Sequence, residues 1–170
     1  MKATSTLLPS EAFLSHSSAN RVFVERLCRE LHRHGIRFWY STRNIAGAQQ
    51  WHDEIGAALS RCDWFVLVLS PESVKSKWVK HELLFALNDS RYERRIVPCV
   101  LKKCDSNRLS WTLSSFQSID FSESFEQGVR DLLQVWSVGY KPHPAPPADA
   151  ATVNKSRRPR KKTKRKESRS

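Results

Sequence analysis

Six consecutive apolar residues, at positions 64–69, restrict the fold of this chain more than any other segment. A strand with one face in solvent alternates apolar and polar side chains, whereas an unbroken apolar run indicates a strand buried on both faces. Helical spacing of apolar residues precedes this run at Ile55 and Leu59 and follows it at Leu83 and Leu87, with Ser76 as the expected N-cap of the second helix. A buried strand between two helices predicts the middle of a parallel sheet that helices cover on both sides.

Shorter apolar or aromatic runs predict four more strands, at residues 12–14, 37–40, 96–101 and 118–120. Helical spacing predicts two further helices, the first with Phe23, Leu27 and Leu31 and the last with Phe125, Val129, Leu132 and Trp136. We therefore expect a flavodoxin-like, doubly wound α/β sheet of about five mostly parallel strands with helices on both faces. Residues 102–117 show no firm element. Pro98 cannot donate to a ladder, which predicts an edge position or a bulge for the fourth strand.

The positive charge of the chain is concentrated at its C-terminus. Residues 151–170 hold ten Lys and Arg residues and one acid, Glu167, and so carry +9 of the net charge of +12. We expect an N-terminal extension at residues 1–10, one folded domain at 11–139, and a disordered tail, first Pro-rich and then basic, at 140–170. The tail is either a solubilising extension or a weak, salt-sensitive contact for nucleic acid or an acidic partner.

Several functional classes lack support in the sequence. No segment has the roughly 18 consecutive apolar residues of a membrane span, and the N-terminus lacks a secretion signal, so we expect a cytoplasmic protein without membrane contact. The cysteines and histidines show no metal-ligand spacing, so we predict no metal site and reduced cysteines. Neither the G-x-G-x-x-G dinucleotide fingerprint nor the G-x-x-x-x-G-K-[ST] phosphate loop occurs.

Three segments, in their order and spacing, resemble the Toll/interleukin-1 receptor (TIR) domain family over most of the predicted domain. Residues 12–17 are similar to the family's first strand and loop, and residues 39–51 to the mobile loop after its second strand. Residues 65–82 are similar to its third strand and the helix that follows, with Trp78 and Glu82 in a Trp-x-x-x-Glu pattern. The resemblance implies the TIR fold.

The resemblance also implies an activity. One branch of the family splits NAD⁺ at the nicotinamide–ribose bond, and its Trp and catalytic Glu are matched here by Trp78 and Glu82. Their i, i+4 spacing puts both side chains on one face of a helix, so the indole can form a wall of the pocket that the carboxylate enters. Further substrate contacts are expected at Ser15, His16, Trp39, Ser41 and Arg43. NAD⁺ is then a substrate, and no cofactor is expected.

The chemistry of NAD⁺ explains why one carboxylate can suffice. Nicotinamide leaves from a positively charged pyridinium, so it departs neutral and needs no general acid. A carboxylate aimed at the ribose stabilises the oxocarbenium-like cation that remains. Attack by water gives ADP-ribose, whereas attack by a group of the same molecule gives a cyclic ADP-ribose isomer, and the sequence favours neither.

Other functions stay open at this point. A non-catalytic TIR adaptor would act by TIR–TIR contacts through the loop at residues 41–50, and Glu82 would be an ordinary helix carboxylate. A nucleoside deoxyribosyltransferase-like enzyme would share a related sheet and a catalytic glutamate. For the NAD⁺-cleaving enzyme, the resemblance implies signalling in antiphage or cell-death defence, self-association through TIR–TIR contacts, and a separate sensor or effector protein.

Overall fold

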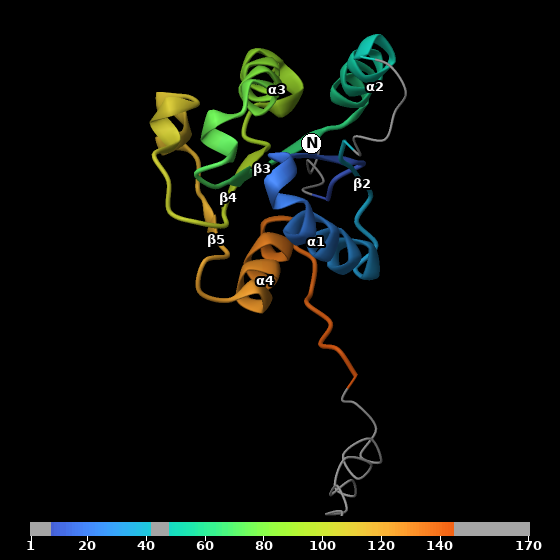
Figure 1. The fold of residues 1–170 in the computed structure, drawn as a ribbon. Coiled ribbons are helices and arrows are strands. Elements are labelled where there is room, and N and C mark those ends of the chain that lie inside the picture. Colours follow the sequence, from blue (N-terminus) through green and yellow to red (C-terminus); the bar gives the residue numbers. More distant parts are fainter. Residues whose placement is uncertain (1–7, 42–47, 145–170) are drawn as a thin grey trace, which may run out of the picture.

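The computed structural model describes residues 8–41 and 48–144, which contain a five-stranded parallel sheet (Figure 1). Its strands are β1 (Ala12–Ser15), β2 (Phe38–Trp39), β3 (Trp64–Leu69), β4 (Ile96–Val100) and β5 (Ile119–Asp120). They lie in the order β2-β1-β3-β4-β5, and every neighbouring pair is parallel. This is the strand order of a flavodoxin-like, doubly wound sheet, so the predicted α/β class is confirmed.

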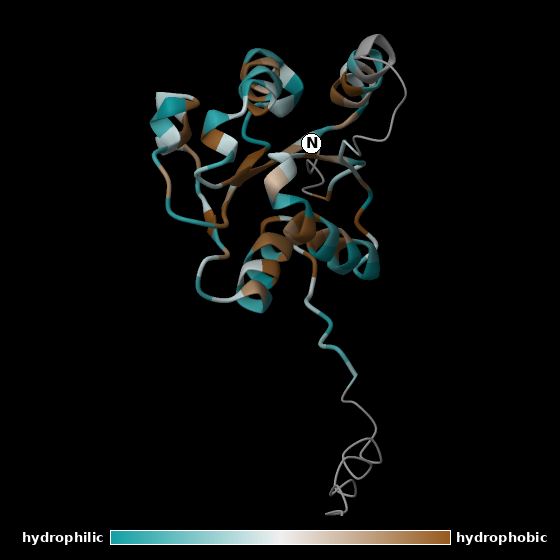
Figure 2. Cartoon of the chain, viewed as in Figure 1, coloured by the Kyte–Doolittle hydropathy of each residue, from teal (hydrophilic) through white to brown (hydrophobic). Residues whose placement is uncertain are grey.

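The α-helices of the described ranges cover both faces of the sheet. They are α1 (Arg21–Arg33), α2 (Ala48–Arg61), α3 (Lys77–Asn88) and α4 (Phe125–Val135). In Figure 1, α2 and α3 lie on one side of the sheet, and α1 and α4 lie on the other. Figure 2 shows that the helices turn hydrophobic residues toward the sheet and hydrophilic residues away from it. Each helix therefore helps to close one of two apolar layers.

β3 is the central strand, and all six of its residues are buried. Val66 and Val68 belong to the apolar layer that includes residues of α1 and α4, whereas Phe65 and Leu67 belong to the layer that includes residues of α2 and α3. Because successive side chains of a strand point to opposite faces, this one segment contributes to both layers. β1 and β4 flank it, which confirms the central position predicted from its unbroken apolar sequence.

The prediction of an edge position or a bulge at Pro98 is wrong, because β4 lies between β3 and β5 and pairs with β3 residue by residue through Pro98. Alternate residues of a strand direct their backbone groups to opposite neighbours. Phe121 N–H donates to Val100 O, so Val100 and Pro98 both face the β5 side. Pairing with β5 begins only at Cys99, opposite Ile119. The missing N–H of Pro98 therefore costs no hydrogen bond to a neighbouring strand.

Two connecting segments contain more helix than the sequence predicts. α2 begins at Ala48, inside the predicted loop at 41–50, of which residues 42–47 lie outside the described ranges. The segment at 102–117 contains two short 3-10 helices, Ser106–Arg108 and Trp111–Ser115. A side chain directly before each of these helices accepts a backbone N–H of its first turn. Such caps act over two residues and leave no apolar periodicity in the sequence.

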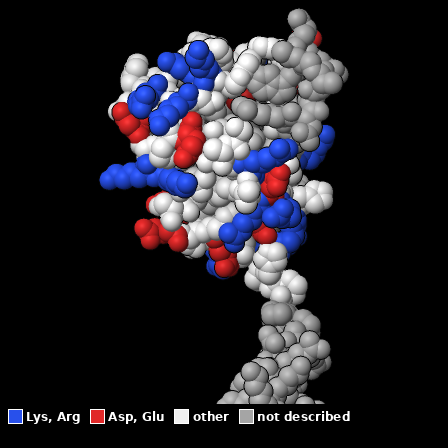
Figure 3. Space-filling view, in the orientation of Figure 1, with Lys and Arg blue, Asp and Glu red and all other residues white. Residues whose placement is uncertain are grey.

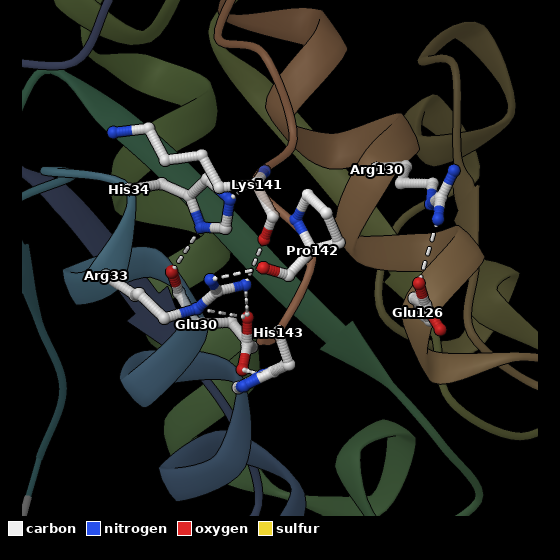
Figure 4. A network of polar contacts seen from close by, with 8 residues as sticks. All are labelled: Glu30, Arg33, His34, Glu126, Arg130, Lys141, Pro142 and His143. Atoms are coloured by element: carbon white, nitrogen blue, oxygen red, sulfur yellow. Dashed lines mark hydrogen bonds and ion pairs between the residues drawn. The ribbon is translucent and has the colours of Figure 1, made fainter. Parts of the chain in front are cut away.

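Residues 140–144 follow α4 without regular secondary structure and lie against α1 (Figure 4). Lys141 N–H donates to His34 Nε2 at 2.9 Å, and His34 Nδ1 lies 2.7 Å from Glu30 O. The His34 ring therefore accepts at Nε2 and donates at Nδ1, as a neutral imidazole does. His143 Nε2 lies 2.6 Å from Glu30 Oε1. These contacts continue beyond the domain end predicted from the sequence, whereas the basic part of the tail lies outside the described residues.

The described surface mixes charges of both signs. On the face drawn in Figure 3, basic and acidic side chains are interspersed. None of the helices in the described ranges is long and apolar enough to cross a bilayer. The cysteines are free thiols, and burial raises the pKa of Cys28 and of Cys62 to about 12. A thiol with so high a pKa stays protonated near neutral pH, which makes Cys28 and Cys62 poor nucleophiles.

Candidate functional site

The carboxyl ends of β1 and β3 lie side by side where the strand order reverses, because the chain proceeds from β1 to β2 on one side and from β3 to β4 on the other. Ligands of doubly wound sheets bind at this kind of position. A cavity of about 80 Å³ lies there, between the segments that follow β1 and β2 and the start of α3. Its walls are His16, Ser18, Arg21, Ser41, Ser76, Trp78 and Glu82.

Glu82 occupies a position of α3 that faces the protein interior. Val79, Leu83 and Ala86 are the buried apolar residues of this helix, and Glu82 falls on the same stripe. Only 6% of its surface is exposed. Glu82 is therefore not an exposed helix carboxylate. Because burying an ionisable group costs free energy, a carboxyl group in such a position beside a cavity indicates a functional site.

Ser15, the last residue of β1, contacts this carboxyl group directly. Its Oγ donates to Glu82 Oε2 at 2.5 Å, and both residues are buried. Burial raises the pKa of Glu82 to about 7, while the hydrogen bond from Ser15 lowers it by stabilising the carboxylate. Near neutral pH the side chain is therefore divided between its acid and carboxylate forms.

Trp78 lies one turn before Glu82 and shares the cavity wall with it. Its position is set by the start of α3, where Ser76 Oγ accepts the Val79 N–H at 3.4 Å, as the sequence predicts for an N-cap. The Trp78 ring contacts His52 of α2 edge to face, with ring centroids 4.6 Å apart. The predicted pair of an indole and a carboxyl group on one side of α3 is therefore present.

The other predicted substrate contacts divide into three groups. His16 and Ser41 join Trp78 in the cavity wall. Trp39 stacks on Phe13, with ring centroids 5.0 Å apart, and packs against the apolar layer next to α2 and α3, so it is not one of the walls. Arg43 lies outside the described residues. What each of these residues contacts in a bound substrate stays a prediction.

Three cavity residues are absent from the sequence prediction of the site: Ser18, Arg21 and Ser76. Ser18 lies in the segment that joins β1 to α1, and Arg21 is the first residue of α1. Arg21 Nε donates to Glu25 Oε1 at 3.1 Å, one turn further along the helix. The available signal was positional, because all three residues follow the carboxyl end of a strand, where ligands of such sheets bind.

The described part of the chain holds no group of three or more His, Cys, Asp or Glu side chains that could bind a metal ion. A larger hollow of about 570 Å³ lies near the amino ends of β3 and β4 and includes Asp63, Arg91 and Arg95 in its lining. Two of its arginines are engaged in ion pairs, since Arg95 lies 3.1 Å from Asp63 and Arg91 lies 2.6 Å from Asp89.

Comparison with known protein families identifies the fold. The model of the TIR domain family matches residues 12–133, a range that includes every strand of the sheet. The chain belongs to the TIR domain family. The family resemblance of the three sequence segments is therefore confirmed, and each of the three contributes residues to the cavity wall.

One similar curated protein is "NAD(+) hydrolase TcpC" of Escherichia coli O6:H1 (strain CFT073). The two are 27% identical over 82 residues, which are 48% of this chain and 27% of that protein. The match therefore covers little more than a quarter of the relative's length.

Two solved structures share the fold. The TIR domain of the Toll-related receptor TRR-2 from Hydra magnipapillata aligns with a TM-score of 0.60 and 19% identity, over 74% of this chain and 96% of that one. A metazoan TIR-STING receptor from C. gigas, in complex with 2',3'-cGAMP, aligns with a TM-score of 0.62 and 24% identity, over 75% of this chain and 39% of that one. At these identities the likeness establishes the TIR fold alone.

Proposed function

We propose that this TIR domain cleaves NAD⁺ at the nicotinamide–ribose bond and releases nicotinamide with ADP-ribose or a cyclic ADP-ribose isomer. The observation that carries the proposal is the buried carboxyl group of Glu82, which borders a cavity beside Trp78 at the switch point of the sheet. A partial match to a protein named as an NAD(+) hydrolase supports the same activity. NAD⁺ acts here as a substrate.

In the proposed reaction, the bond between the ribose C1′ and the nicotinamide nitrogen breaks, and its electron pair leaves with nicotinamide. The nicotinamide becomes neutral, and the positive charge passes to the ribosyl group, where the Glu82 carboxylate stabilises it. Water then bonds to C1′ and loses a proton. A pKa of about 7 suits Glu82 to accept that proton near neutral pH. When an atom of the ADP-ribosyl group reaches C1′ before water, the product is cyclic.

The cavity walls fit this division of roles. Its volume of about 80 Å³ is smaller than the roughly 300–1,000 Å³ typical of sites that enclose a whole small ligand. It can therefore enclose only one part of NAD⁺, and the Trp78 indole offers a flat apolar surface for the nicotinamide ring. The Glu82 carboxyl group in the same wall then meets the adjoining ribose.

Nicotinamide release by the purified full chain tests the proposal. We expect Glu82→Gln to lower kcat by about 10²–10³-fold, as for other groups that stabilise developing charge. Glu93→Gln is the matched control, because Glu93 is exposed and lies in the distant hollow near Arg91 and Arg95. It should retain wild-type turnover. Mass spectrometry of the products separates hydrolysis from cyclisation.

The rival functions predict other results in the same assay. A non-catalytic adaptor would leave NAD⁺ intact in both wild type and Glu82→Gln, also at high protein concentration. A deoxyribosyltransferase-like enzyme would release bases from nucleosides supplied in place of NAD⁺. Under the proposal, self-association through TIR–TIR contacts raises turnover with protein concentration, and a signalling role in antiphage or cell-death defence follows from the nucleotide product.

A further inference from the structure

We propose that Arg21 binds the diphosphate of NAD⁺, so that the substrate lies between a cationic wall of the cavity and the carboxyl group of Glu82. This inference rests on the proposed function, because it assigns the part of the same substrate that lies away from the reacting bond. It adds a binding residue to which the sequence analysis assigned no role.

Arg21 is placed for this contact by the fold. It is the first residue of α1 and lines the same cavity as Glu82, although 61 positions separate them in the sequence. Its side chain is 40% exposed, so its guanidinium can meet a ligand that enters from solvent. A guanidinium matches phosphate oxygens with two parallel N–H donors, which makes arginine well suited to bind a diphosphate.

Two serine hydroxyls accompany Arg21 in the wall. Ser18 lies just before α1, and Ser76 lies just before α3. The Ser76 Oγ accepts a backbone N–H of its helix and keeps its own O–H to donate. The first turns of α1 and α3 also present partial positive charge on this side. The wall therefore combines one full cationic charge with hydroxyl donors, as an anionic group requires.

The distribution of charge within the cavity selects the class of ligand. A simple anion would be repelled by the Glu82 carboxylate, which forms part of the same small cavity. Because the cavity encloses only one end of such a ligand, a cationic ring and its ribose would lie inside, beside Trp78 and Glu82, and a diphosphate would lie at the opening, where Arg21 is 40% exposed. NAD⁺ has this arrangement, because its pyridinium and its diphosphate are separated by one ribose.

Glu25 holds Arg21 in the absence of ligand. The pair is an exposed i, i+4 contact, with 40% of the Arg21 and 42% of the Glu25 side chain accessible. Exposed pairs of this kind contribute little to stability, so Arg21 can exchange the Glu25 carboxylate for a phosphate at small cost. The negative charge of Glu25 also opposes an anionic ligand. Removing that charge should therefore strengthen substrate binding.

Steady-state kinetics of the full chain with two substrates test the assignment. With NAD⁺, we expect Arg21→Gln to raise KM by about 10–100-fold, the loss of a charge-assisted contact, with kcat within about twofold of wild type. With nicotinamide riboside, which has the same scissile bond and no phosphate, the variant and wild type should have equal KM. Arg29→Gln is the matched control, since Arg29 lies on the same helix, is exposed and is not a cavity wall.

Glu25→Gln gives a test of opposite sign. It should lower KM for NAD⁺ several-fold, an improvement that general damage to α1 would not produce. A KM for NAD⁺ that is unchanged in Arg21→Gln, in an active enzyme, would overturn the role of Arg21 and leave the proposed function intact.

Calorimetric titration with ADP-ribose separates binding from turnover. If wild type does not cleave NAD⁺ but binds ADP-ribose about tenfold or more tightly than Arg21→Gln, the cleavage proposal fails and the diphosphate site stands. Equal affinity of wild type, Arg21→Gln and Arg29→Gln would overturn the site. A wild type that neither binds ADP-ribose nor cleaves NAD⁺ would overturn both proposals.

Discussion

Ser15 Oγ donates a 2.5 Å hydrogen bond to Glu82 Oε2, which joins the end of β1 to the middle of α3 across 67 positions of the chain. Both side chains are buried, so water does not compete for this bond. Burial favours the neutral acid and the hydrogen bond favours the carboxylate, and the pKa of about 7 is their balance. Ser15 therefore controls how much of Glu82 carries the charge that the proposed reaction needs.

Ser15→Ala should shift the pH dependence of NAD⁺ cleavage to higher pH. The wild-type rate is expected to rise as Glu82 loses its proton, with a midpoint of about 7. Removing the hydroxyl raises the pKa of Glu82, so the midpoint should move up by about one pH unit or more. The measurement is kcat/KM from pH 5 to 9.5. Activity should fall at pH 6.5 and return at pH 9.

The control for this shift is Ser70→Ala. Ser70 is also a buried serine at a strand end, but its Oγ donates to Asn20 Oδ1, away from the carboxyl group. The pH midpoint of kcat/KM for Ser70→Ala should match that of the wild type. If Ser15→Ala lost activity equally at all pH values, Ser15 would be a packing residue with no influence on the charge of Glu82.

The buried carboxyl group should also make stability depend on pH. The folded chain keeps the Glu82 proton up to about pH 7, whereas a free glutamate loses it near 4.5, so unfolding between these values releases a proton. The free energy of unfolding therefore falls as pH rises through this interval. Glu82→Gln removes the effect. Between pH 4 and pH 8, the free energy of unfolding of this variant should rise by roughly 3 kcal/mol relative to that of wild type.

Urea unfolding of both proteins at several pH values measures this difference. The same variant should thus lose activity and gain stability at pH 8, the opposite of what a damaged core gives. A difference in unfolding free energy that stays constant from pH 4 to pH 8 would contradict the raised pKa of Glu82.

A pair of glycine substitutions tests the packing of α4. A methyl group added at Gly128 would lie 2.5 Å from Phe121 Cδ1, and Phe121 is buried and contacts the rings of Phe23 and Phe125. Gly128→Ala should therefore destabilise the fold by about 1–3 kcal/mol. Gly56 of α2 has nothing within 4 Å of the same added atom. Gly56→Ala should instead stabilise by about 0.5–1 kcal/mol through helix propensity. Thermal unfolding of both variants measures the contrast, and equal effects would contradict it.

The sequence predicts those parts of the fold that local patterns determine. β3 is predicted to the residue, because six buried apolar positions in a row permit one assignment. The N-cap at Ser76 follows from residue type and position alone. The sequence predicts a strand at 37–40, but only two residues of β2 pair with β1. An aromatic run does not show how far the hydrogen bonds to the neighbouring strand extend.

The candidate site is predicted only in part, for a physical reason. The family resemblance implies Trp78 and Glu82, and their i, i+4 spacing shows from the sequence that they share one helix face. In the sequence, Ser18 looks like an ordinary residue before a helix, and Arg21 looks like a solvated arginine. They border Glu82 only because β1 pairs with β3, a contact between distant segments that no local pattern encodes. The value of Glu82's pKa is equally nonlocal, since it depends on burial and on Ser15.

The last prediction concerns the segment after α4. Tyr140 stacks on His34 with ring centroids 5.5 Å apart, and the Arg130 guanidinium lies 4.6 Å from the centre of the same ring. Arg33 donates to the carbonyl groups of Lys141 and Pro142. Removing residues 140–170 should therefore cost about 1–3 kcal/mol of stability and lower Tm by several degrees. Removing only residues 145–170 retains all of these contacts and should leave Tm unchanged. If both truncations left Tm at the wild-type value, the folded unit would end at the helix, as the sequence alone predicts; if both lowered it equally, stabilising contacts would have to come from the basic part of the tail.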